Sequence, residues 1–272
     1  MKPPFAYYGG KTTIAERIVS LLPAHGHYVE PFAGSLAVLF AKPASAMETV
    51  NDLDGDLMTW WRVLRDRPDE LIRLCALTPH SRAELEACRE PAGDELEQAR
   101  RAWVRIAQGR TGTLRKTGWR HFVNPSGSST SMPDYLEAYV DRMASAAERL
   151  AAVSLECLPG LEVVAKYGAE PECLLYVDPP YLGSLRHRNY QTEMGGADDH
   201  RALAEALGTA RGAVVLSGYD SRLYRELYAG WDRLTIETQT FQGNKRSERT
   251  EVLWFNRPLG RDLFTGLENA HE

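Results

Sequence analysis

The sequence predicts an α/β protein built on a doubly wound sheet, and three observations support this class. A short apolar run at Tyr28-Val29 is followed by a glycine, Gly34, that permits a tight turn, and then by helical composition in residues 35–41. Strand-like and helix-like segments alternate again after residue 153. The 272 residues, 43% of them hydrophobic, suffice for one substantial core and a smaller insert.

The elements can be placed in order along the chain. Helical patterning marks residues 12–22, then a stretch from 56 to 108 that is interrupted at Pro68, Pro79 and Pro91, and then residues 135–152. We therefore expect residues 1–55 and 153–272 to form one domain, and residues 56–152 to form a mostly helical insert. Later strands are expected at 154–158, 173–177, 213–216, 234–241 and 252–255, with helices at 199–211 and 222–228.

A rigid turn follows the apolar run at 173–177. Its sequence is Asp178-Pro179-Pro180-Tyr181, and the two prolines fix φ near about −65° and remove two backbone donors, so the strand must end there. A carboxylate, prolyl carbonyls and an aromatic ring held together suit an exocyclic amino group on a flat heterocycle, such as adenine or cytosine. The alternative is an ordinary turn in which Asp178 caps a backbone group and Tyr181 packs in the core.

The first strand–loop–helix unit predicts a nucleotide site. In such sheets ligands lie outside the carboxyl ends of the strands, and an acidic residue about 20 positions beyond the glycine loop accepts hydrogen bonds from ribose hydroxyls. Asp52 has this spacing from Gly34. Its alternative role is the N-cap of a helix that begins before Leu57.

Several segments of the chain, in the same order as in the family, resemble the Dam-type (alpha-group) adenine-N6 DNA methyltransferases. Asp-Pro-Pro-Tyr at 178–181 resembles their motif IV. The other segments similar to this family are Tyr7-Tyr8-Gly9-Gly10-Lys11, Glu30-Pro31-Phe32-Ala33-Gly34, Asn51-Asp52, Asn189-Tyr190, Asp199-His200 and Ser217-Gly218-Tyr219-Asp220. Two positions depart from the family pattern: Leu36 stands where a second glycine is common, and Tyr7 stands where Trp is commoner.

The resemblance implies a Rossmann-like methyltransferase sheet that ends in an antiparallel hairpin and uses S-adenosylmethionine, and it implies double-stranded DNA as the partner. It assigns catalysis to Asp178, Pro179, Pro180 and Tyr181. It assigns cofactor contacts to Tyr7, Lys11, Glu30, Phe32, Gly34, Asp52 and Asp178. Glu156 is suggested as the contact to the cofactor's adenine ring.

The chemistry of adenine explains why these groups are needed. The lone pair of N6 is delocalised into the ring, which makes this nitrogen a poor nucleophile. Acceptance of its two N–H bonds by Asp178 and the Pro179 carbonyl would localise the lone pair toward the sulfonium methyl, through positioning and electrostatics. Because N6 is buried in a duplex, the base must be flipped out, and Tyr181 offers a face on which it can stack.

The distribution of charge predicts the DNA contacts. Net charge is −5, yet residues 100–133 hold seven Lys or Arg and no Asp or Glu, and much of this stretch is a Gly/Thr/Ser-rich loop. Cations neutralise phosphates, and Arg and Asn can also contact base edges. The candidates are Arg110, Arg115, Lys116, Arg120 and Asn124, joined by Lys245 and Arg246 at a predicted hairpin turn. The alternative in both places is an ordinary solvated loop.

Other classes of function are disfavoured. The chain contains neither an apolar run of about 18 residues nor a charged-then-apolar leader, so we expect a cytoplasmic protein of a bacterial or phage-infected cell, without a membrane partner. Its four cysteines lack metal-site spacing, so we expect reduced, semi-buried thiols and no metal. A cytosine-N4 DNA methyltransferase, an RNA adenine methyltransferase and a catalytically inactive DNA-binding regulator remain alternatives. The recognised DNA site, a restriction-enzyme partner and the oligomeric state stay open.

Overall fold

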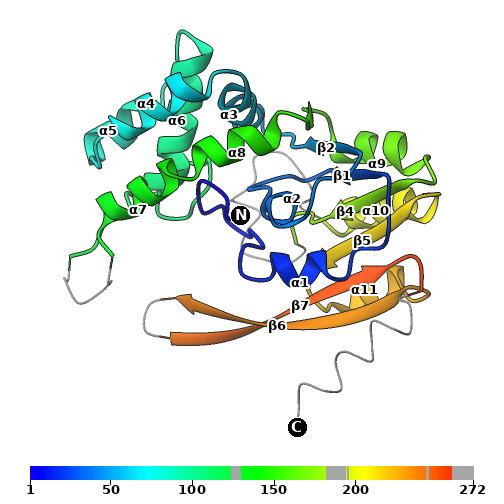
Figure 1. The fold of residues 1–272 in the computed structure, drawn as a ribbon. Helices are drawn as coiled ribbons and strands as arrows, with labels where there is room; N and C mark the ends of the chain where they lie inside the picture. Colours follow the sequence, from blue (N-terminus) through cyan, green and yellow to red (C-terminus); the bar gives the residue numbers. More distant parts are fainter. Residues whose placement is uncertain (124–129, 182–193, 195, 243–244, 259–272) are drawn as a thin grey trace.

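A seven-stranded sheet forms the centre of the computed structural model, which describes residues 1–123, 130–181, 194, 196–242 and 245–258 (Figure 1). Its order is β3-β2-β1-β4-β5-β7-β6. The strands are β1 (His27–Glu30), β2 (Met47–Asn51), β3 (Ser154–Glu156), β4 (Cys173–Val177), β5 (Ala213–Gly218), β6 (Asp232–Gln242) and β7 (Lys245–Phe255). The predicted Rossmann-like α/β class is confirmed.

The strand directions place a ligand site. β3, β2, β1, β4 and β5 are parallel, whereas β7 runs antiparallel to β5 and β6. The strand order reverses between β1 and its neighbour β4, and such switch points open a crevice beyond the carboxyl ends of the strands. Glu30 ends β1, and Asp178 directly follows β4. The sheet therefore brings these two carboxyl groups to the same edge.

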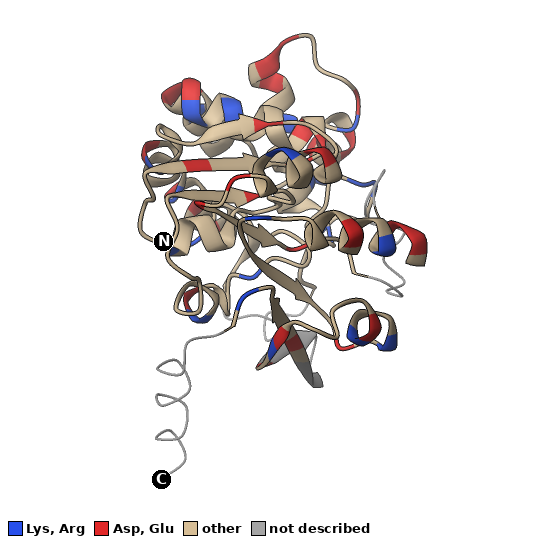
Figure 2. Cartoon of the chain, turned by 90° about the vertical axis from the view of Figure 1, so that its right-hand side faces the viewer, with Lys and Arg blue, Asp and Glu red and all other residues tan. Residues whose placement is uncertain are grey.

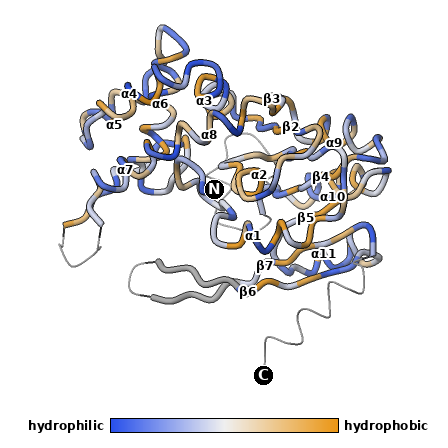
Figure 3. The backbone as a smooth tube through the Cα atoms, in the orientation of Figure 1, coloured by the Kyte–Doolittle hydropathy of each residue, from blue (hydrophilic) through white to orange (hydrophobic). Residues whose placement is uncertain are grey.

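Helices cover both faces of the sheet because the side chains of its middle strands alternate between two cores. In β4, Leu174 and Tyr176 face one core, while Leu175 and Val177 face the other. The first core includes α1 (Ala15–Val19), α2 (Ala37–Ala41) and the insert; the second includes α9 (Gly160–Gly168), α10 (Ala197–Gly208) and α11 (Arg222–Leu227). β4 and β5 are buried throughout, and hydrophobic sequence follows the central strands in Figure 3.

The segment between β2 and β3 is mostly helical, and its helices lie to one side of the sheet (Figure 1). They are α3 (Gly55–Asp66), α4 (Pro68–Ala76), α5 (Arg82–Ala87), α6 (Glu95–Gln108), α7 (Met132–Val140) and α8 (Met143–Leu150). The single helix predicted at 135–152 is wrong, because the chain forms two helices there. The first begins earlier, at a capping box that Ser131 and Asp134 form. The prediction also missed α9.

The interpretation of residues 100–133 as an uncompensated positive block is wrong for its first three arginines. Arg100 and Arg101 both pair with Glu97, and Arg105 pairs with Asp56, all at 2.7 Å. Glu97 lies one turn before Arg100 and Arg101 on α6, and Asp56 lies on α3, which packs against α6. Both acidic partners precede residue 100, so a count of charges within 100–133 leaves them out. Figure 2 shows acidic and basic residues interspersed over the outer helices.

Two further findings concern the described residues. None of their helices is both long and apolar enough to cross a membrane, and their His, Cys, Asp and Glu side chains form no cluster suited to a metal ion. All four thiols are free: Cys75, Cys88 and Cys173 are buried as small hydrophobes, whereas Cys157 is exposed, contrary to the expectation of semi-buried thiols.

Candidate active site

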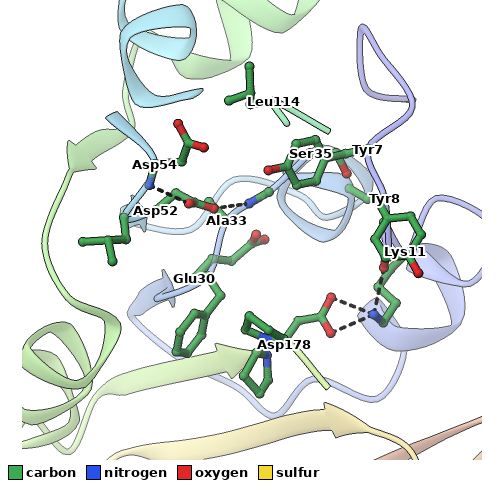
Figure 4. A pocket seen from close by; sticks show the side chains of 18 of the residues that line it. Tyr7, Tyr8, Lys11, Glu30, Ala33, Ser35, Asp52, Asp54, Leu114 and Asp178 are labelled. Atoms are coloured by element: carbon green, nitrogen blue, oxygen red, sulfur yellow. Dashed lines mark hydrogen bonds and ion pairs between the residues drawn. The ribbon is translucent and has the colours of Figure 1, made fainter. Parts of the chain in front are cut away.

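A cavity of about 520 Å³ opens at the carboxyl ends of β1, β2 and β4 (Figure 4). It brings together the residues that the sequence suggested for catalysis and cofactor binding, apart from Glu156. These are Tyr7, Lys11, Glu30, Phe32, Gly34, Asp52, Asp178, Pro179, Pro180 and Tyr181. Arg115 of the insert also lines it. Segments that are far apart in sequence thus meet around one cavity.

Backbone geometry shapes the loop after β1. Gly34 has φ of 50°, a left-handed conformation that glycine adopts without a steric penalty. A Cβ atom there would also lie 3.3 Å from the Tyr7 ring. The Asp52 carboxylate accepts hydrogen bonds from the Gly34 amide and the Asp54 amide, each at 3.0 Å. Asp54 caps α3, so the alternative of Asp52 as this helix's N-cap is wrong.

Leu36 occupies the position where the resembling family commonly has glycine. Its φ is 57° and its ψ is 30°, so its backbone is in the left-handed conformation. For a residue with a side chain this conformation costs about 1–2 kcal/mol of strain. The Leu36 side chain is fully buried in the core at the start of α2, as expected. Burial of a leucine contributes roughly 1.5–3 kcal/mol, which offsets the strain. Leucine at this position therefore takes a left-handed conformation that glycine would adopt without strain, and its packing anchors the start of α2.

Glu30 lies buried beneath this loop. Its Oε1 accepts hydrogen bonds from the Tyr28 hydroxyl at 2.7 Å and the Leu39 amide at 2.8 Å, which ties the end of β1 to α2. Burial raises the pKa of the Glu30 carboxyl from 4.5 to about 8, and the two hydrogen bonds only partly oppose this. At neutral pH this group is mostly a neutral acid.

The second half of the cavity is organised by an ion pair. The Lys11 ammonium lies 2.7 Å from each oxygen of Asp178 and 3.0 Å from the Gly9 carbonyl, to which it donates. Figure 4 shows the two side chains pointing toward each other. Burial alone would lower the pKa of Lys11, but the contact with the Asp178 carboxylate outweighs burial and raises that pKa.

The contacts of Asp178 leave part of its carboxylate for a substrate. Oδ1 accepts from Lys11 and from the Tyr181 hydroxyl, which lies 2.7 Å away. Oδ2 accepts from Lys11 alone among the described contacts. Because a carboxylate oxygen has two lone pairs, Oδ2 retains one acceptor position. Asp178 can therefore accept one N–H bond from a bound group without releasing Lys11.

Tyr181 is held on several sides. The Lys11 ammonium lies 4.9 Å from its ring centroid, and Tyr219 packs edge-on against it with centroids 4.5 Å apart. Its hydroxyl also contacts Ser217 and Glu251. Glu251 is not among the site residues that the sequence predicts. The available signal was strand periodicity, because alternation along β7 places Glu251 on the same buried face as Leu253.

Comparison with known proteins identifies the family. The sequence model of the D12 class N6 adenine-specific DNA methyltransferases matches residues 7–241. The chain belongs to this family. It is therefore an enzyme that methylates the N6 amino group of adenine in DNA.

Curated relatives match this methyltransferase over most of their length. It is 26% identical to the type II methyltransferase M1.LlaDCHI of Lactococcus lactis subsp. cremoris, over 93% of each chain. It is 26% identical to the retron Ec67 DNA adenine methylase of Escherichia coli, over 90% of this chain and 88% of that one. It is 25% identical to a DNA adenine methylase of Vibrio cholerae serotype O1, over 82% and 83%.

The predicted DNA contacts of the methyltransferase lie in different surroundings. Arg110 and Lys116 are exposed, Arg120 is half-buried, and Arg115 lines the cavity. Asn124 lies outside the described residues. Lys245 and Arg246 begin β7, paired along the backbone with Gln242 and Phe241, and their side chains also lie outside the described part. Only Arg115 is thus seen to reach the site.

Trp119 of the insert and Glu156, the suggested contact to the cofactor's adenine ring, both have structural partners in the methyltransferase. Trp119 stacks between His80 and His121, with ring centroids 4.4 and 4.9 Å away, so it packs within the insert. Glu156 lies outside the lining of the cavity. It pairs instead with Lys166 at 2.9 Å and accepts a hydrogen bond from Tyr167 at 2.7 Å.

The pKa of Glu30 makes a prediction about stability. The folded methyltransferase holds this proton up to about pH 8, whereas the unfolded chain loses it near 4.5. The free energy of unfolding should therefore fall as pH rises between these values, by up to about 1.4 kcal/mol per pH unit from this group. Glu30→Gln should remove this contribution.

Urea unfolding of both proteins between about pH 5 and pH 8 checks this. The difference in unfolding free energy between Glu30→Gln and the wild type should change steadily in favour of the variant as pH rises. His25 and His27 titrate in both proteins, so they cancel in that difference. A difference independent of pH would show that Glu30 is already ionised at pH 5.

Proposed function

We propose that this enzyme transfers a methyl group from S-adenosylmethionine to the N6 atom of an adenine that has been flipped out of duplex DNA at a specific sequence. One observation carries the proposal. The glycine loop with Asp52 and the Asp178–Tyr181 turn face the same cavity. A cofactor bound at the glycine loop and Asp52 would place its reactive end close to a base bound at the Asp178–Tyr181 turn.

The residues of the cavity fit the cofactor. Gly34 has no side chain, so the space beside the Tyr7 ring stays open for a ligand. The Phe32 ring offers an apolar surface in the same cavity. Asp52 supplies acceptor oxygens suited to ribose hydroxyls. S-adenosylmethionine, when bound, supplies the electrophilic methyl group on its sulfonium. In this proposal Tyr7, Lys11, Glu30, Phe32, Gly34, Asp52 and Asp178 line its site.

The remaining groups act on the base. Asp178 Oδ2 accepts one N6 hydrogen, and the Pro179 carbonyl accepts the other, so the N6 lone pair is freed from the ring. Tyr181 and the two prolines form the rigid turn that holds these acceptors in place. Lys11 fixes the carboxylate and balances its charge. No strong general base is needed, because positioning and electrostatics supply the rate.

We assign residues 1–55 and 153–272 to the catalytic domain and residues 56–152 to target recognition. Arg115 joins the two, because it lines the cavity while its loop belongs to the insert. Arg110, Lys116, Arg120, Asn124, Lys245 and Arg246 would contact phosphates and base edges around the flipped nucleotide. The enzyme would act in the cytoplasm, where it meets DNA.

Product analysis tests the proposal. The protein is incubated with S-adenosylmethionine and unmethylated duplex DNA, the DNA is digested to nucleosides, and methylated species are quantified by mass spectrometry. N6-methyladenine is expected, and sequencing of the modified positions gives the target. N4-methylcytosine, or methylation of RNA in preference to DNA, would overturn the assigned substrate. No product together with no cofactor binding would favour a non-catalytic DNA-binding protein.

A glycine outside the cavity allows a test of the cofactor site. A Cβ atom on Gly160 would lie 2.5 Å from Cζ of Phe32, so Gly160→Ala should push that ring into the cavity. The Kd for S-adenosylmethionine, measured by calorimetry, should rise by about tenfold, or roughly 1.4 kcal/mol. Gly208→Ala is the matched control, since a Cβ there meets no described atom within 4 Å. Equal affinities in the two variants would place the cofactor away from Phe32.

A further inference from the structure

Four oxygen atoms lie in contact behind the catalytic carboxylate. The Tyr181 hydroxyl is 2.7 Å from Oδ1 of Asp178 and also within hydrogen-bond reach of Oε1 of Glu251. The Ser217 hydroxyl is 2.6 Å from the same Oε1. These groups come from the β4 turn, β5 and β7, so three adjacent strands build the cluster.

Counting hydrogens shows that one is missing. The three close contacts are Tyr181 with Asp178, Tyr181 with Glu251, and Ser217 with Glu251, and each needs a hydrogen between its two oxygens. Tyr181 and Ser217 supply one hydroxyl hydrogen each. If both carboxyls are ionised, one pair of oxygens must face each other with lone pairs only. A third proton in the cluster satisfies all three contacts.

Glu251 is the site that best accommodates this proton. Its side chain is almost fully buried, and the Lys11 ammonium that neutralises Asp178 at 2.7 Å lies 3.9 Å from Glu251. A single cation thus faces two carboxyls in a region shielded from water. Burial raises the pKa of Glu251, Asp178 raises it further, and Lys11 opposes both. With the proton on Glu251, the group of Lys11, Asp178 and Glu251 is electrically neutral.

We propose that Glu251 is a positioning residue for methyl transfer. It carries a proton and donates it to the Tyr181 oxygen, so that Tyr181 must donate its own hydrogen to Asp178. The proposal rests on the proposed role of Asp178 as the acceptor of the N6 hydrogen. Its effect is to fix the direction of the Tyr181 hydroxyl and, with it, the carboxylate orientation that leaves Oδ2 available.

Loss of this proton would reverse the arrangement. The ionised Glu251 carboxylate would take the Tyr181 hydrogen, and Oδ1 of Asp178 would then face the bare Tyr181 oxygen. Asp178 would have to turn away from its place beside Pro179. The other titratable groups that face this cluster are Lys11, Glu30, Tyr176, Tyr219 and Tyr224.

Infrared spectroscopy tests the proton directly, without reference to activity. The carbonyl stretch of a protonated carboxyl group should be present in the wild type at neutral pH and lost in Glu251→Gln. The Glu30 carboxyl contributes equally to both proteins and cancels in the difference spectrum. An ionised-carboxylate band in its place would overturn the proposal, even if the wild type methylates DNA normally.

Single-turnover rates test the positioning role. The wild-type rate should fall by up to about tenfold per pH unit once Glu251 ionises. Glu251→Gln keeps a permanent N–H donor toward Tyr181, so it should retain the rate at low pH and lose this alkaline decline. Parallel pH profiles in the two proteins would overturn the proposal.

Two further variants separate positioning from folding. Glu251→Ala should lower the rate at least about tenfold at every pH, and adding it to Tyr181→Phe should cause no further loss, because the two groups act through one contact. Ser217→Ala is the comparison variant, since it removes the Ser217 contacts with Glu251 and Tyr181 and leaves the contact between Glu251 and Tyr181 in place. Additive losses would show that Glu251 acts independently of Tyr181. Absence of wild-type product would contradict the proposed function instead and leave the infrared result standing.

Discussion

Replacement of Asp178 by Ala is expected to lower the single-turnover rate of methyl transfer by at least about a thousandfold. Removal of one preorganised electrostatic group from an active site commonly costs 10²- to 10³-fold, and Asp178 both accepts the N6 hydrogen and anchors Lys11 and Tyr181. Loss of the acceptor returns the N6 lone pair to the ring. Saturating DNA or cofactor should not restore the rate, since the lost interaction acts on the chemical step.

The measurement uses excess enzyme, labelled cofactor and a duplex that carries the target. Asp198→Ala is the matched control, because it removes an exposed carboxylate on α10 whose partner in the described salt bridges is Arg201. It should react at the wild-type rate. A normal rate in Asp178→Ala, with the protein shown to be folded by circular dichroism, would contradict the proposed mechanism.

The sheet and the cavity were predictable because local signals agree with the global fold. Gly34 lies at a turn that requires a positive φ, and Pro179 and Pro180 must end β4, so each signal fixes where its strand stops. In a parallel sheet the strands end at one edge. Knowing the ends of β1, β2 and β4 is therefore almost enough to place Glu30, Asp52 and Asp178 together.

Glu251 was not predictable in the same way. It lies 70 residues from Tyr181. Their contact depends on β7 pairing antiparallel with β5, in the register that sets Leu253 opposite Ser217 and Val252 opposite Gly218. A shift of one residue in that register would turn Glu251 to the other face. Local sequence does not specify such a register, although alternation along β7 indicates which of its residues share a face.

Charge was likewise misleading when it was read along the chain. Arg105 belongs to a run of cations in sequence, but its partner Asp56 lies 49 residues away on α3, which packs against α6. Ion pairs form between residues that are close in space, so a count of the charges in one segment of sequence overstates the positive potential at its surface. The exposed Arg110 and Lys116, which carry no such partner in the described salt bridges, are the better indicators of a phosphate-facing surface.

The second large effect concerns the stability that Lys11 provides. Lys11→Met should lower the free energy of unfolding by about 3 kcal/mol, the lower end of the range for removal of one partner from a buried ion pair. The lower end applies because the Asp178 side chain keeps 19% exposure, and water can screen part of its charge. The variant should also lose methyl transfer, because Asp178 then loses the cation that contacts both of its oxygens and keeps only the Tyr181 hydroxyl at Oδ1.

A second substitution separates charge from packing. Lys11→Met with Asp178→Asn replaces the ion pair by neutral groups of similar volume, so it should recover at least about 1 kcal/mol relative to Lys11→Met alone, while activity stays lost. Urea unfolding measures both changes. Lys166→Met removes an exposed partner of Glu156, so it should leave the free energy of unfolding nearly unchanged. If the double variant were no more stable than Lys11→Met, the loss would reflect the packing of the lysine stem, and the uncompensated charge of Asp178 would contribute little.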